Sequence, residues 1–97
     1  MVFDWSEEKN ILLKETRSIG FERIVIVIAI ENGDVLAVFD HPNKDKYRNQ
    51  IMIIVKVDNY AYSVPAVKDK EYWFLKTIIP SRKYTEKYIP GERRKGK

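Results

Sequence analysis

The pattern of hydrophobic and polar positions begins with a short strand followed by a helix. Alternation in Val2-Phe3-Asp4-Trp5 favours a strand over residues 2–5. Ser6 is a preferred N-cap residue, and two acids follow it, where the helix dipole favours them. A helix is therefore predicted from residue 7 to residue 16 or 17, ended by Ser18-Ile19-Gly20. The residues expected near its inner face are Ile11, Leu12 and Glu15.

Residues 21–32 carry two patterns that predict different structures. The run 24–30 is rich in β-branched residues, which favour strands, and Asn32-Gly33 is a common hairpin turn. Yet Phe21, Ile24 and Ile28 have helical spacing, and Gly33 suits the position just after a helix end. On these residues alone, strand and helix are nearly equal alternatives.

The rest of the chain reads mainly as strands. Four strands are predicted, over residues 35–39, 51–57, 60–67 and 72–79. Asp58-Asn59 is a two-residue hairpin turn, and Pro65 makes its strand irregular or places it at an edge. A short helix over residues 82–88 follows, ended by Pro90-Gly91. The predicted class is α+β: N-terminal helices packed on an antiparallel sheet of three to four strands, with a short C-terminal helix.

Composition restricts the class of protein. Ninety-seven residues, of which 44% are hydrophobic, suit one small domain over residues 1–89. The chain has no cysteine, so disulfides and thiolate metal sites are excluded. Its longest apolar run is far shorter than a bilayer span, and the N-terminus does not resemble a signal peptide. We therefore expect a soluble, cytoplasmic protein without a membrane partner.

Charge is distributed unevenly along the chain. Residues 82–97 hold seven Lys/Arg and two Glu, whereas residues 1–81 hold eleven Lys/Arg and twelve Asp/Glu. Such asymmetry suggests an electrostatic partner, with nucleic acid first and an acidic protein second. Residues 90–97 are expected to form a basic, disordered tail, and for residues 92–97 a solubilising role is the simpler interpretation.

The start of the last helix is the most informative stretch. Arg82 and Lys83 would be its first residues, where cations oppose the helix dipole by roughly 0.3–1 kcal/mol each. Cations beside free backbone N–H groups suit a bound anion such as a phosphate. The alternative is that Arg82 and Lys83 only form part of a solvated helix face. Further along this helix, Tyr84, Lys87 and Tyr88 are candidates for binding the same substrate.

Other candidate residues lie elsewhere. Arg48 could bind phosphate, and Tyr47 could stack on a base or donate a proton, although both also suit a plain loop. Lys76 could line an active face of the sheet or an ordinary polar one. His41 is a possible catalytic residue within a segment that otherwise reads as a turn. No metal site or cofactor is predicted, because the acids around His41 follow no established ligand spacing.

The order of several short motifs resembles the BrnT family of bacterial toxins. These motifs are Phe3-Asp-Trp5, Glu8-Lys9-Asn10, Gly20-Phe21-Glu22, Phe39-Asp40-x-Pro42 and Ile79-Pro-Ser-Arg-Lys83, and they span about residues 2–88. The resemblance implies a RelE-like fold, a helix over residues 21–32 and a ribonuclease neutralised by an antitoxin, for which a ribbon-helix-helix protein is one candidate. The family's Arg-Lys pair would correspond to Arg82 and Lys83.

The function expected from these features is metal-independent cleavage of RNA. The 2′-OH would attack the adjacent phosphate, which requires a proton acceptor, a proton donor and cations that stabilise the phosphorane. Because the chain has one histidine, a two-histidine pair is impossible within it. The candidate catalytic residues are Arg82, Lys83, His41 and Tyr47. A non-catalytic module of the same fold that binds nucleic acid or protein is the alternative, and a subunit whose basic tail docks an acidic antitoxin is a third.

Overall fold

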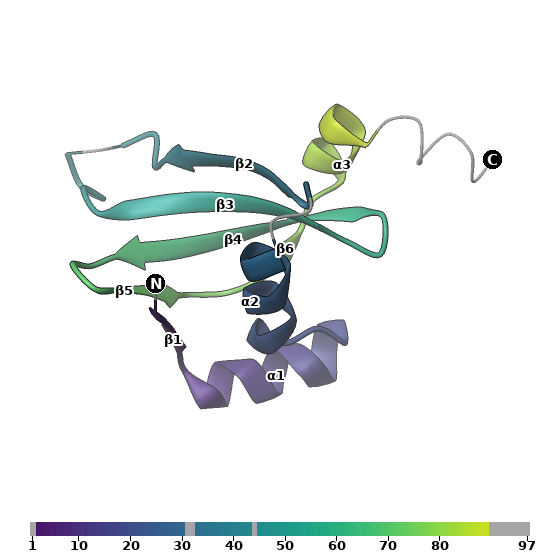
Figure 1. Ribbon diagram of the computed structural model, residues 1–97, viewed down its shortest axis with the longest axis horizontal. Helices are drawn as coiled ribbons and strands as arrows, with labels where there is room; N and C mark the ends of the chain where they lie inside the picture. The colour runs from purple at the N-terminus through teal and green to yellow at the C-terminus, as the bar shows by residue number, and fades with distance from the viewer. Residues whose placement is uncertain (1, 31–32, 44, 90–97) are drawn as a thin grey trace.

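The computed structural model describes residues 2–30, 33–43 and 45–89. The predicted tail over residues 90–97, the helix stop at Pro90-Gly91 and the end of the helix predicted for residues 21–32 lie outside the described residues. The elements are β1 Val2–Trp5, α1 Glu7–Arg17, α2 Phe21–Ile30, β2 Val35–Asp40, β3 Gln50–Val57, β4 Tyr60–Lys68, β5 Tyr72–Leu75, β6 Ile79–Pro80 and α3 Arg82–Tyr88. The α+β class is thereby confirmed. Figure 1 shows α1 and α2 together near β1, with α3 apart from them near β2.

The described strands form one mixed sheet of six strands in the order β1-β5-β4-β3-β2, with β6 paired to β4. The prediction of three to four antiparallel strands was wrong in size and in pairing. β1 joins the sheet parallel to β5, with Val2 opposite Tyr72 and Trp5 opposite Leu75. A parallel pair needs a long connection between its strands, so local sequence patterns do not reveal it.

The strand predicted over residues 72–79 is divided into β5 and β6, and Pro65 lies at the break. β4 is a central strand, which corrects the edge position considered for Pro65. The Pro65 carbonyl accepts the Lys76 N–H at 2.9 Å, so its backbone groups point toward β5 and β6. The missing proline N–H therefore falls where the neighbouring strand is interrupted, and the β3–β4 ladder keeps its register.

α1 turns a different face inward from the one predicted. Asn10 and Leu13 are buried, whereas Ile11 and Leu12 are 51% and 49% exposed and Glu15 is exposed. Asn10 is buried because its side chain connects the two N-terminal helices. Its Oδ1 accepts the Phe21 N–H at 2.7 Å, and its Nδ2 donates to Glu22 at 2.9 Å. The Asn10 side-chain amide binds a backbone N–H in the first turn of α2, and this bond sets the rotation of α1 about its axis.

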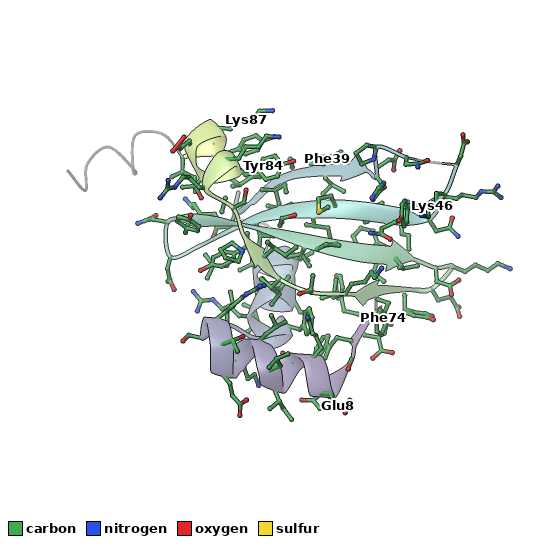
Figure 2. The ribbon with its side chains drawn as sticks, turned by 180° about the vertical axis from the view of Figure 1, so that it is seen from behind. Glu8, Phe39, Lys46, Phe74, Tyr84 and Lys87 are labelled. Carbon is green, nitrogen blue, oxygen red and sulfur yellow. The ribbon has the colours of Figure 1, made fainter. Side chains whose placement is uncertain are left out.

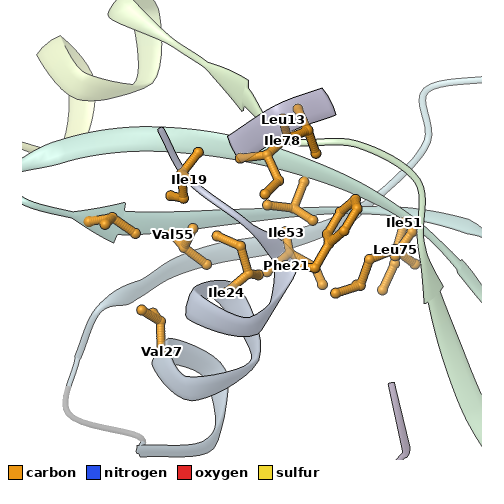
Figure 3. Packing of buried hydrophobic residues seen from close by; sticks show 13 residues of the cluster. Leu13, Ile19, Phe21, Ile24, Val27, Ile51, Ile53, Val55, Leu75 and Ile78 are labelled. Atoms are coloured by element: carbon orange, nitrogen blue, oxygen red, sulfur yellow. The ribbon is translucent and has the colours of Figure 1, made fainter. Parts of the chain in front are cut away.

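α2 is a helix, as the resemblance implied, and its buried side chains explain why. Phe21, Ile24 and Val27 recur at helical spacing and are buried. In Figure 3 they lie against Ile53 and Val55 of β3. This core outweighs the strand propensity of the β-branched run, because tertiary packing overrides intrinsic preference. The predicted hairpin turn at Asp58-Asn59 is confirmed, with φ of 53° and 62° at the two residues.

The two faces of the sheet are covered by different helices. Ile53 and Val55 belong to the main core with α1 and α2, whereas Ile54 packs with Ala61 and Ile89. Because side chains alternate along a strand, Ile54 lies on the opposite face. We call this opposite face, which carries Ala37, Phe39, Met52, Ile54 and Ala61, the α3 face. Among the helices of the described residues, none has the length and apolar character to cross a bilayer.

Candidate nucleic-acid interface

α3 is fixed to β4 by its own polar side chains. The Ser81 hydroxyl accepts the Tyr84 N–H at 3.1 Å and caps the helix. Thr85 is fully buried, and its hydroxyl accepts the Ala61 N–H at 2.8 Å. The Ser81 N–H donates to the Ala61 carbonyl at 2.9 Å, so both backbone groups of Ala61 are bound by α3 and its cap. The helix position is therefore set by β4.

Arg82 and Lys83 are the first two residues of α3, as predicted, and both are exposed. The first turn, all of it within the described residues, contains no acid. However, Ser81 already satisfies one of the backbone donors that the sequence argument assigned to a bound anion. An anion at this end would be held chiefly by the two cationic side chains.

Tyr84 and Tyr88 extend from α3 over the α3 face. The ring centroid of Tyr84 lies 6.0 Å from that of Phe39 and 6.1 Å from that of Tyr88. The Nζ of Lys83 lies 5.5 Å from the Tyr84 ring, and that of Lys87 lies 5.3 Å from the Tyr88 ring. Figure 2 shows Tyr84 next to Phe39, with Lys87 beyond them on α3. Aromatic rings alternating with cations characterise surfaces that bind single-stranded nucleic acid.

His41 and Tyr47 are brought together by the loop between β2 and β3. Their ring centroids lie 4.2 Å apart, and the Nζ of Lys46 lies 5.4 Å from the Tyr47 ring. The backbone N–H of His41 donates to the Gln50 carbonyl, so the β2–β3 ladder continues by one residue beyond Asp40. Strand alternation then places His41 on the same face as Phe39, about 7 Å further along the strand.

The hydrogen bonds of His41 restrict its chemistry. Its Nδ1 accepts the Asn43 N–H at 3.0 Å, so the neutral ring carries its proton on Nε2. The imidazole can therefore donate a hydrogen bond from Nε2, whereas its acceptor nitrogen is occupied by the loop. This geometry suits a hydrogen-bond donor better than a general base.

Arg48 and Lys76 belong neither to α3 nor to the His41–Tyr47 pair. Arg48 is exposed and borders two shallow depressions at the end of the sheet, one shared with Lys46 and Tyr47 and one with Lys68 and Lys70. Lys76 follows β5 and is exposed, with its N–H bonded to the Pro65 carbonyl. Among the described residues, no group of three or more His, Cys, Asp or Glu side chains is arranged to hold a metal ion.

Apart from Arg48 and Lys76, the predicted site residues form two groups on one face. Arg82, Lys83, Tyr84, Lys87 and Tyr88 belong to α3, and His41 and Tyr47 belong to the β2–β3 loop with Lys46 beside them. Phe39 extends from β2 toward the first group and was not among the candidate site residues predicted from the sequence. One signal could have indicated the shared surface: the dipeptide Lys-Tyr occurs at 46–47, 83–84 and 87–88.

Comparisons of the chain with protein-family models, with curated proteins and with solved structures give no match. The relation to BrnT-like toxins is therefore a proposal that rests on the order of its sequence motifs.

Proposed function

We propose that this protein is a toxin-like, metal-independent endoribonuclease of the RelE/BrnT type, held inactive by a partner antitoxin. The observation that carries the proposal is the surface on the α3 face where three Lys-Tyr pairs and Phe39 lie. Base stacking on tyrosine and charge attraction from lysine are the two forces that hold unpaired RNA.

In the proposed reaction the 2′-OH loses its proton to a water molecule as its oxygen attacks phosphorus, the bond to the 5′-oxygen breaks, and the departing oxygen takes up a proton. Arg82 and Lys83 would stabilise the negative charge of the phosphorane, because both are exposed cations beside the Tyr84 platform. Tyr47 would donate the proton to that oxygen, and His41 would donate a hydrogen bond to it from Nε2. Arg48 and Lys76 would bind phosphates further along the RNA.

A non-catalytic nucleic-acid-binding module is the second candidate, and one observation favours it. The cations Arg82 and Lys83 belong to α3, whereas Tyr47 lies in the loop beyond β2. Cleavage at a single phosphate requires the cations and the proton donor to converge within hydrogen-bond reach. Binding without cleavage needs no such convergence.

Incubation of the purified protein with RNA, with and without EDTA, tests the proposal. Equal cleavage in both samples is expected, and no cleavage at stoichiometric enzyme would refute the catalytic part. Arg82→Ala/Lys83→Ala should abolish cleavage. Lys68→Ala/Lys70→Ala removes the same charge from another exposed segment and should retain most of it. If both double variants lose activity equally, net charge and not the α3 site is responsible.

A further inference from the structure

β2 forms one edge of the described sheet, and its backbone is directed outward at Val38. The His41 N–H points to β3, where it bonds Gln50, and backbone direction alternates along a strand. The backbone N–H and C=O of Phe39 therefore also point to β3, where Phe39 is paired with Met52. The backbone N–H and C=O of Val38 point away from β3. Beyond Val38 no further strand lies in the described part of the chain. Its N–H and C=O are placed to pair with an added strand.

β2 has few of the features that normally protect an edge. Its six residues, Val35-Leu-Ala-Val-Phe-Asp40, include no lysine and no proline, and the one irregularity is a shift of register between Val35 and Ala37. The opposite edge differs. β1 has four residues, and its Trp5 N–H is already bound by the Asp4 carboxylate at 2.8 Å. The two edges are therefore unequal, and β2 is the one suited to pairing.

The side chains near β2 specify what an added strand should contain. Val38 points to the face covered by α1 and α2 yet is 52% exposed, and Ile26 of α2, on the same side of the sheet, is also 52% exposed. On the α3 face, Lys83 lies over Tyr84, which contacts Phe39, and Lys87 lies over Tyr88, which stacks on Tyr84. Lys46 lies over the Tyr47 ring, which contacts His41. One face of the added strand would thus meet apolar groups and the other would meet cations.

We propose that β2 is the docking edge for an extended segment of a partner protein in which apolar and acidic residues alternate. Its apolar side chains would cover Val38, and its carboxylates would lie near Lys46, Lys83 and Lys87. Charge favours this occupant over a second copy of the chain, because two copies paired through β2 would bring the same lysines together. The inference rests on the proposed function, since it gives the controlling partner its docking site.

A synthetic peptide of alternating valine and glutamate, long enough to pair with the six residues of β2, serves as the probe. Titration of the labelled peptide into the full chain should show binding, and hydrogen exchange at the Val38 amide should slow. A valine–lysine peptide should not bind. Val38→Pro removes only an outward N–H, because the ladder bonds are made by Phe39 and its alternate neighbours, and it should weaken binding on the order of tenfold or more.

Val38→Lys, which keeps the backbone donor, should weaken binding as well and covers the case in which Val38→Pro does not fold. Val2→Lys is the matched control, because it adds the same charge at an exposed valine of the other edge strand and should leave binding unchanged. Equal binding by wild type and both Val38 variants would overturn the proposal. So would no binding of the valine–glutamate peptide, or sedimentation as a dimer that Val38→Lys dissociates. RNA cleavage is measured separately, so peptide binding without cleavage refutes only the proposed function.

Discussion

The hydroxyl of Thr85 accepts the backbone N–H of Ala61 at 2.8 Å, and both residues are fully buried. Thr85 also donates to the Ser81 carbonyl at 2.7 Å, so one side chain connects β4, the cap and α3. The Thr85–Ala61 bond satisfies a backbone donor near the start of β4 that would otherwise pair with a neighbouring strand. The orientation of Tyr84, one residue before Thr85, depends on it.

Replacing Thr85 with valine should destabilise the protein by about 1–3 kcal/mol. The isosteric side chain keeps the volume but leaves the buried Ala61 N–H without its acceptor. Urea unfolding measures the change. Thr16→Val is the matched control, because the Thr16 hydroxyl bonds the Leu12 carbonyl at an exposed position, and its effect should stay within about 0.5 kcal/mol. Equal effects of the two variants would contradict a structural role for the Thr85–Ala61 bond.

Stability should fall below about pH 4.5 partly because of Glu22. The hydrogen bond from Asn10, together with the Glu22 backbone and Lys14, lowers the pKa of this carboxyl from 4.5. A carboxyl whose pKa is lower in the folded state contributes stability above its unfolded pKa, and that contribution is lost as pH falls through the folded pKa. The difference between the unfolding midpoints of wild type and Glu22→Gln should therefore be smaller at pH 3 than at pH 7. A Glu22→Gln difference that is the same at both values would show no linkage.

Gly20→Ala should destabilise the connection between α1 and α2 by about 1–3 kcal/mol. A Cβ at this position would lie 2.5 Å from Lys14 Cε, 2.7 Å from Glu22 Oε1 and 2.9 Å from Asn10 Oδ1. Lys14 and Glu22 end in flexible groups, but Asn10 is buried and binds the Phe21 N–H. Thermal unfolding measures the loss. Adding Lys14→Ala should recover part of it, and no recovery would leave Glu22 and Asn10 as the obstacles.

Tyrosine and lysine on the α3 face should affect RNA binding in different ways. Tyr84→Ala should weaken binding of a single-stranded oligonucleotide by about 1–3 kcal/mol without changing its salt dependence. Lys83→Ala/Lys87→Ala should lower the slope of log K against log salt by about 1.4, since each phosphate contact to a single strand contributes about 0.7. Titrations at several salt concentrations separate these outcomes. A Tyr84 variant that changes the slope alone would exclude stacking.

Local sequence was sufficient for most elements and for the residues at the start of α3. Ser6 accepts an N–H of the first turn at the helix start that its residue type predicted, and Ser81 does the same at the start of α3. The Asp58-Asn59 turn and the strands on either side also follow from local preference. Each of these depends on groups within a few residues of one another, so the sequence contains the whole interaction.

The sequence by itself therefore determined the α+β class, the helix caps, the central hairpin and the cationic first turn of α3. The tertiary structure decided the rotation of α1, the parallel addition of β1, the break at Pro65 and the gathering of Phe39 and Tyr84 on one face. The physical reason is how far apart in the sequence the interacting groups lie. Caps and turns satisfy backbone groups nearby, whereas these four features depend on which distant residue satisfies a buried donor or fills a buried space.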